Sequence, residues 1–131
     1  MKKLLITTVL CFTILLTGCE SNNYTAKDMV DNLTEDSYEL KFESLDGLIV
    51  KKLTNSKNQD ASLYCKGTIE SGTINIYYKV FAMDKTLIFT ITSEDDFNEI
   101  NGYATNGATV TLYIEADEAY NGNIEIGIRT Y

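Results

Sequence analysis

The sequence predicts an all-β protein, a roughly seven-stranded antiparallel β-sandwich, with a small barrel as the second choice. From Tyr38 onward, apolar and polar residues alternate with a period of two, which is typical of strands with one buried and one wet face. Turn signals such as Asp46-Gly47 and Asn121-Gly122 separate these runs at short intervals. Two such sheets bury their apolar faces against each other, as immunoglobulin-like and jelly-roll-like sandwiches do.

Each alternating run predicts one strand. Asp46-Gly47 is expected to turn the chain between the first two strands, and Asn121-Gly122 is expected to form a hairpin between the last two. Gly127 lies inside the final run and indicates a bulge or a close backbone approach. The predicted strands cover residues 38–43, 48–53, 63–70, 74–81, 87–92, 110–116 and 124–129.

One stretch breaks the period-two pattern. Ser93-Glu94-Asp95-Asp96 resembles a capping box, in which a serine side chain caps a helix and an acid follows three residues later. Phe97 and Ile100 are spaced to anchor one helical turn. The following residues, 101–107, contain two Gly and two Asn and are expected to form a loop, with a short strand at Tyr103 as an option.

The first 19 residues have the pattern of a secretory leader. A positive start, Met1-Lys2-Lys3, precedes the uncharged run 4–16, which is shorter than the roughly 20 apolar residues needed to cross a bilayer. Leu16-Thr17-Gly18-Cys19 follows and resembles the bacterial lipobox. The resemblance implies that a signal peptide, residues 1–18, is removed and that the Cys19 thiol carries a covalent diacylglycerol, with no other cofactor expected.

The leader implies three segments. They are the signal peptide 1–18, a lipidated N-terminus and tether 19–36, and a β-sandwich domain 37–131. The tether is polar, and a short helix capped by Thr25 is one option for it, with disorder beside the anchor as the other. The localisation implied is the extracytoplasmic face of the cell membrane.

The charge of the chain excludes nucleic acid as a partner. Without residues 1–18 the chain has 9 Lys and Arg against 19 Asp and Glu, a formal charge of −10. Phosphate binding needs clustered basic side chains, and Lys51-Lys52 is the only basic pair in this part of the sequence. An anionic membrane should repel such a domain, so the lipid on Cys19 is expected to hold it there.

The cysteine and histidine counts argue against catalysis. Cys65 is the only other cysteine that remains after the leader is removed, so no internal disulfide is expected and Cys65 should be a core residue. The chain contains no His to activate a cysteine or to ligate zinc or copper. Nineteen carboxylates make chance pairs common, and we do not expect an enzyme.

Tyrosines provide the first candidate ligand face. Tyr64, Tyr77 and Tyr113 occupy the polar phase of three predicted strands. Aromatic rings on an exposed sheet face can stack on a sugar or pack on a peptide. The alternative is that tyrosine simply suits strands and packs across them.

Acidic residues provide the second candidate, a weak calcium site at Glu94, Asp95, Asp96 and Glu99. Clustered carboxylates can supply the oxygen ligands that calcium needs, but the spacing does not match an EF-hand. The alternative is a solvated helix start favoured by the helix dipole. We therefore expect no metal.

These observations favour a non-catalytic binding or interaction module at the cell surface. Its partners would be the membrane, through the lipid anchor, and a protein, peptide or glycan ligand. The alternative is a structural or accessory subunit of an envelope complex, and a small hydrolase is a less favoured third reading.

Overall fold

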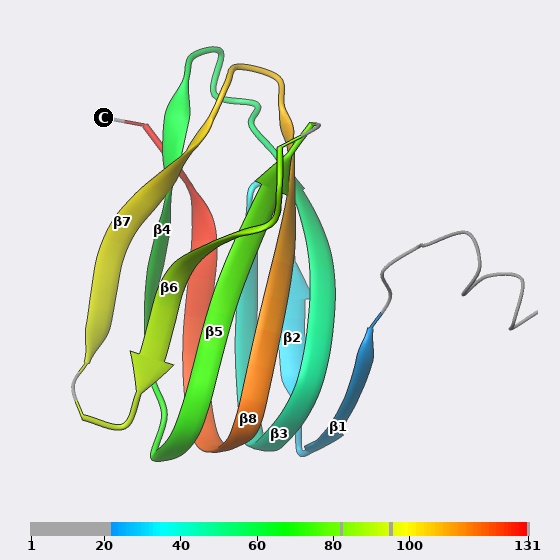
Figure 1. Cartoon of the computed structure of the whole chain (residues 1–131), viewed down its shortest axis with the longest axis vertical. Coiled ribbons are helices and arrows are strands. Elements are labelled where there is room, and N and C mark those ends of the chain that lie inside the picture. The colour runs from blue at the N-terminus through cyan, green and yellow to red at the C-terminus, as the bar shows by residue number, and fades with distance from the viewer. Residues whose placement is uncertain (1–21, 82, 95, 131) are drawn as a thin grey trace, which may run out of the picture.

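A computed structural model describes residues 22–81, 83–94 and 96–130 of the chain. Eight antiparallel strands fold into two facing layers (Figure 1), which confirms the predicted antiparallel β-sandwich with one strand more than the roughly seven expected. The strands are β1 (Asn23–Lys27), β2 (Val30–Leu33), β3 (Ser37–Thr54), β4 (Ala61–Thr68), β5 (Ser71–Val80), β6 (Thr86–Thr92), β7 (Phe97–Ala104) and β8 (Thr109–Arg129).

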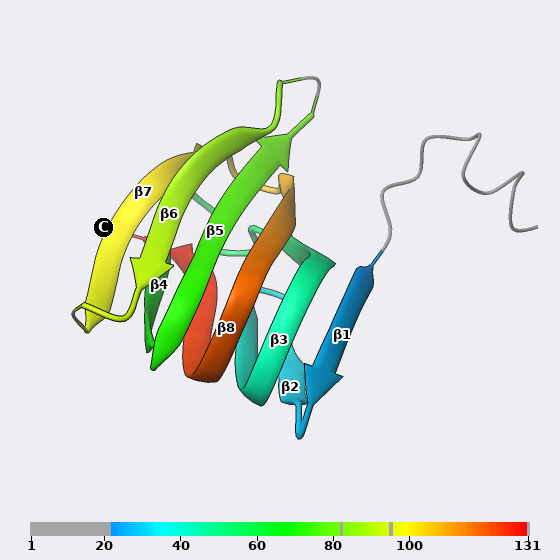
Figure 2. The same ribbon diagram turned by 60° about the horizontal axis from the view of Figure 1, so that its bottom comes forward.

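Two long strands, β3 and β8, belong to both layers. They pair along almost their whole length and bend together from one layer into the other (Figure 2). The first layer has the order β1-β3-β8-β5-β6 and uses residues 44–54 of β3 and 109–120 of β8. The second layer has the order β2-β3-β8-β4-β7 and uses residues 37–42 and 122–129.

The core lies between the layers and is built from every second residue of the strands. Ile49, Ile114 and Ile76 are neighbours across β3, β8 and β5, and each is 0% exposed. Full burial of one such side chain stabilises the fold by roughly 1.5–3 kcal/mol. Cys65 is also fully buried, and this burial, with the nearby charge of Glu99, raises the pKa of its thiol to about 12. The expectation that Cys65 is a core residue is confirmed.

The hairpin predicted at Asn121-Gly122 is wrong, because β8 continues through these residues. A type I′ hairpin turn requires a positive φ at both central residues. Only Asn121 has one, at 49°, and Gly122 stays opposite Phe42 in the β3–β8 ladder. The chain therefore bends at this point and passes from the first layer into the second instead of reversing.

The turn predicted at Asp46-Gly47 is also wrong, since β3 runs on as one strand. The register with β8 shifts between Leu45 and Gly47, which makes an irregularity in the ladder. Gly47 has φ +118°, and a Cβ there would collide with the backbone of Asn23 and Tyr24 in β1. Glycine at this position thus allows β1 to pair closely against a kinked strand.

The helical turn predicted over 97–100 is wrong, because these residues begin β7. The strand continues to Ala104, so the loop predicted from residue 101 begins only after it. Four residues form too short a helix to be stable without tertiary support. Pairing of β7 with β4 supplies more hydrogen bonds, and the Phe97 ring packs edge-on against Phe89 at a centroid distance of 5.8 Å. Tertiary contacts therefore override the local capping signal.

The stretch assigned to the tether contains two strands. β1 and β2 pair with successive parts of β3, and the short helix considered after Thr25 is absent, since Thr25 pairs with Asp46. The signal peptide 1–18 and Cys19 lie outside the described residues. Within residues 22–81, 83–94 and 96–130, no helix has the length and apolarity to span a membrane.

Hydrogen bonds of buried polar side chains join the edge strand β2 to β3 and join two loops at one end of the sandwich. Tyr38 is fully buried, and its hydroxyl donates to Asp31 of β2 at 2.8 Å, while Lys51 lies 4.0 Å from the same carboxylate. At the end, the buried side-chain amide of Asn55 lies 2.9–3.0 Å from the carbonyls of Gln59, Ala104 and Thr105. It thereby joins the loop after β3 to the loop after β7.

Truncation of the central core residue tests this arrangement. Ile114→Ala should lower the free energy of unfolding by about 2–5 kcal/mol, because the side chain is fully enclosed by both layers. The neighbouring exposed variant Glu115→Ala should stay within about 0.5 kcal/mol of wild type. Urea denaturation measures both, and equal costs at the two positions would contradict the layer assignment.

Candidate functional site

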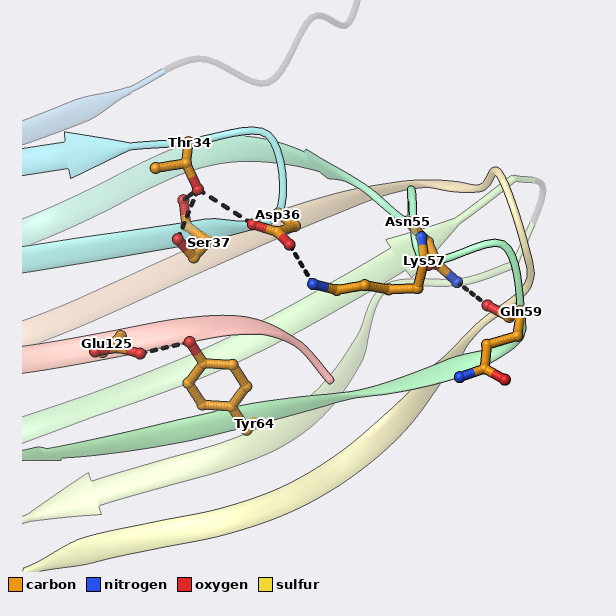
Figure 3. A network of polar contacts seen from close by, with 8 residues as sticks. All are labelled: Thr34, Asp36, Ser37, Asn55, Lys57, Gln59, Tyr64 and Glu125. Carbon is orange, nitrogen blue, oxygen red and sulfur yellow. Dashed lines mark hydrogen bonds and ion pairs between the residues drawn. The ribbon is translucent and has the colours of Figure 1, made fainter. Parts of the chain in front are cut away.

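The outer surface of the second layer carries an open depression with a volume of about 470 Å³. It lies where β3, β4 and β8 run side by side, below the loop that follows β3 (Figure 3). Its lining is mainly polar and consists of Asp36, Ser37, Lys57, Tyr64, Lys66, Asn98, Glu125, Ile128 and Arg129. Tyr64 supplies the aromatic ring of the site.

Tyr64 is held in place by a glycine on the neighbouring strand. Tyr64 and Gly127 are register partners, and a Cβ at Gly127 would lie only 2.6 Å from the tyrosine ring. In place of the bulge or close backbone approach predicted for Gly127, the structure has a side chain: the Tyr64 ring occupies the space that any side chain at Gly127 would need. One side of the ring is thus fixed against the sheet, and the residue remains half-buried.

A carboxylate fixes the other end of the tyrosine. The Tyr64 hydroxyl donates to Glu125 Oε2 at 2.5 Å, and Lys66 Nζ lies 3.8 Å from Oε1 of the same group. Burial, followed by the hydrogen bond to Glu125, holds the pKa of Tyr64 well above its usual range. The phenol therefore stays protonated and acts as a donor throughout the physiological pH range.

A second ion pair lies at the rim of the depression. Lys57 Nζ contacts Asp36 Oδ2 at 2.6 Å, and the Thr34 hydroxyl donates to Oδ1 at 3.3 Å (Figure 3). The hydrogen bond from Lys57 lowers the pKa of Asp36 below its usual value, although partial burial opposes the shift. Asp36 is thus a fixed anion and is unsuited to act as a general acid.

The depression offers a mixture of donors and acceptors around one ring. Lys66, Asn98 and Arg129 contribute amine, amide and guanidinium groups, and Glu125 contributes carboxylate oxygens. Such a lining suits a ligand rich in hydroxyl groups and disfavours an apolar one, because buried polar groups must keep hydrogen-bond partners.

The three tyrosines predicted as one face do not lie together. Tyr77 and Tyr113 are register partners on β5 and β8 of the first layer, with Lys85 Nζ 5.0 Å from each ring centroid. Tyr64 lies on β4 in the second layer. The expected three-residue patch is therefore divided between opposite outer faces, and Tyr113 is only 5% exposed.

The acidic run is also divided. Glu94 and Asp96 line a shallow, open hollow in the turn before β7, whereas Glu99 is within β7, opposite Cys65 of β4. Asp95 lies outside the described residues. In the part of the chain that the structure describes, no three His, Cys, Asp or Glu residues are grouped to hold a metal ion.

Several residues of the depression carry little sequence signal. The contact between Lys66 and Glu125 follows from the β4–β8 register, which the sequence does not give. Lys57 belongs to a polar loop whose sequence does not indicate its ion pair with Asp36. The usable signals were Tyr64, on the polar phase of its strand, and Gly127, because a glycine inside a strand can mark a close approach.

Comparisons with known proteins give distant structural neighbours. No protein-family model matches the chain, and no curated protein matches it. Among solved structures, a mutant of the carbohydrate-binding module CBM29-2 complexed with mannohexaose shares 15% identity and a TM-score of 0.42, covering 83% of this chain and 79% of that one. A second family 29 mutant shares 12% identity and a TM-score of 0.39, with the same coverages of 83% and 79%.

A third neighbour, CBM35 from Paenibacillus barcinonensis, shares 14% identity and a TM-score of 0.36, covering 85% of this chain and 84% of that one. Because the identities and TM-scores of these neighbours are low, the ligand of this chain is inferred from its own side chains.

The Lys57–Asp36 pair predicts a specific pH dependence. Because the folded pKa of Asp36 is depressed, the pair stabilises the fold above the ordinary carboxyl value of 3.8, and this stabilisation is lost as the pH falls through the folded pKa. Lys57→Gln should therefore be less stable than wild type near neutral pH and equal to it in strong acid.

Urea unfolding at a series of pH values measures this difference. Lys41→Gln is the matched control, since Lys41 is exposed and forms no ion pair with a described carboxylate. A difference between wild type and Lys57→Gln that persists unchanged into strong acid would show that the pair does not set the pKa of Asp36.

Proposed function

We propose that this chain is a lipid-anchored, non-catalytic binding module on the extracytoplasmic face of a membrane, and that the depression of the second layer holds a glycan. The observation that carries the ligand class is the fixed Tyr64 ring, packed on Gly127 and bonded to Glu125, at the centre of a polar hollow. A sugar presents hydroxyl groups around its edge and C–H groups on its faces, so it needs both polar partners and an aromatic surface.

The arrangement favours binding over hydrolysis. Glycoside hydrolysis uses two carboxyl groups, one of which must be protonated near neutral pH. Asp36 is bound to Lys57, and Glu125 is engaged by both Tyr64 and Lys66. These contacts position the two carboxylates as acceptors for ligand hydroxyls.

The anchor is supported by the leader and by the position of β1. The lipobox-like sequence ends at Cys19, and β1 begins at Asn23, so only a few residues separate the lipid from the sandwich. Three residues of extended chain, from Cys19 to Asn22, reach at most about 11 Å. The binding module would therefore lie close against the bilayer.

Glycan binding can be tested directly. The purified protein should retain at least one oligosaccharide on a glycan array, and titration should show at least about tenfold weaker binding for Tyr64→Ala, equivalent to about 1.4 kcal/mol. Tyr64→Phe keeps the ring and loses the bond to Glu125, so its affinity should lie between the two.

The matched control for this titration is Tyr120→Ala, which removes an exposed tyrosine outside the depression. It should bind like wild type. Equal affinity of wild type and a folded Tyr64→Ala would exclude the depression as the site, and a lack of any retained glycan would exclude the ligand class.

The anchor requires a separate experiment. Wild type expressed in bacteria should enter the detergent phase of a phase-partitioning assay and should carry the mass of a diacylglyceryl group. Cys19→Ala should lose that mass because it lacks the thiol that accepts the lipid. A wild-type protein that fractionates as soluble and carries no lipid would overturn the anchor and leave the glycan proposal standing.

A further inference from the structure

Three lysines gather at one end of the first layer, on its outer surface. Lys52 on β3 and Lys79 on β5 both pair with Thr111 of β8, which lies between them. Lys85 precedes β6, and its amine lies 5.0 Å from the ring centroids of Tyr77 and Tyr113. We call these three lysines, together with Phe81 directly after β5, the lysine end.

The lysines of this end lack the partners that other lysines have. Ion pairs with described carboxylates are formed by Lys27, Lys51, Lys57 and Lys66. Lys52, Lys79 and Lys85 are exposed and form none within the described part of the chain. Only Asp84 opposes them in the hairpin sequence 81–85. The lysine end thus sets three lysines against Asp84, with Glu35 next to Thr54 just beyond the end of β3, in a domain whose overall charge is negative.

An exposed aromatic residue projects from the same end. Phe81 lies at the tip of the β5–β6 hairpin and is 77% exposed. Its φ of 54° is that of a turn residue, and Met83 N donates a hydrogen bond to Val80 O at 3.2 Å across the turn. Figure 2 shows that this hairpin extends beyond the neighbouring strands of the first layer.

The chain enters the sandwich at this end as well. The side chain of Asn22 accepts a hydrogen bond from Val50 N at 2.7 Å, two residues before Lys52. β1 and β5 are three strand spacings apart in the first layer, roughly 14 Å. Cys19 lies within about 11 Å of Asn22 along the chain. Val50 and Lys52 are roughly 7 Å apart along β3, so this reach brings an anchor at Cys19 to the level of Lys52.

The opposite end of the same layer has the opposite charge. Asp46, Glu115, Asp117 and Glu118 are exposed and lie toward the bend of β3 and β8. An anionic bilayer would attract the lysine end and repel the acidic end. Both effects would turn the lysine end toward the bilayer.

We propose that the lysine end rests on anionic phospholipid headgroups, with Phe81 at the boundary between headgroups and acyl chains. This inference rests on the proposed lipid anchor, which supplies the attachment, while the lysine end sets the orientation. Basic side chains close to an anionic leaflet are attracted to it, and an aromatic ring is accommodated at the interface. The depression is on the opposite outer face, and its rim residue Lys57 lies in the loop that follows β3, at the same end of the domain.

The chain has no Trp, so a single introduced tryptophan reports on its own position. The full chain carrying Phe81→Trp is purified from the membrane fraction and reconstituted in phosphatidylcholine vesicles with or without phosphatidylglycerol. With phosphatidylglycerol, its emission should shift to shorter wavelength and should be quenched by brominated lipids. Tyr120→Trp, at the acidic end, is the matched control and should show neither effect.

The lysines are tested in the same system. Lys52→Gln, Lys79→Gln and Lys85→Gln combined with Phe81→Trp should abolish the shift, and high salt should weaken it. Equal quenching of Phe81→Trp and Tyr120→Trp in a chain whose mass shows the lipid would overturn this inference alone. A chain without the lipid would overturn the anchor and this inference with it, and it would leave the glycan site untouched.

Discussion

The pairing of β3 with β8 is the interaction on which the rest of the structure depends. Each strand is long enough to run through both layers, and the ladder between them is continuous except for the irregularity at Leu45 and Gly47. Every other strand attaches, directly or through one neighbour, to one half of this pair. The bend in the pair therefore decides which residues face the core and which outer surface each exposed side chain joins.

This dependence explains what could be predicted from the sequence and what could not. Period-two alternation identified most strands and the buried phase, including Cys65, because one wet and one dry face impose that pattern on any half-buried strand. Alternation carries no information about which layer a strand joins. Tyr64 and Tyr113 thus had the same pattern although they lie on opposite faces.

The wrong turn predictions have a common cause. Asp46-Gly47 and Asn121-Gly122 both have the local chemistry of tight turns, and in each pair one residue does adopt a positive φ. Their contacts with β1 and with Phe42 hold the chain in the sheet, so the same residues produce a kink and a bend. Glycine and asparagine supply permitted backbone angles, whereas tertiary pairing decides whether the strand ends.

The positions of the charged side chains, and not only their sum, decide how the domain meets an anionic surface. Residues 19–131 together have a formal charge of −10, and a chain with that charge is expected to be repelled by anionic surfaces. Screening limits such repulsion to about 8 Å at physiological ionic strength, so an approaching surface responds mainly to the charges at the end it meets. The separation of unpaired lysines from acidic side chains along the first layer therefore bears more on orientation than the total charge does.

The sharing of β3 and β8 between the layers also constrains how the chain folds. The ladder joins Thr54 to Thr109 and Ser37 to Gly127, so its first contacts close long loops that carry a large entropic cost. Cys65 is the one cysteine in the described residues and is unpaired, so no crosslink shortens those loops. Folding dominated by such distant pairings is slow, on the order of milliseconds to seconds. Because both layers need the same two strands, we expect neither layer to form a stable intermediate alone, and the sandwich should assemble in a single cooperative step.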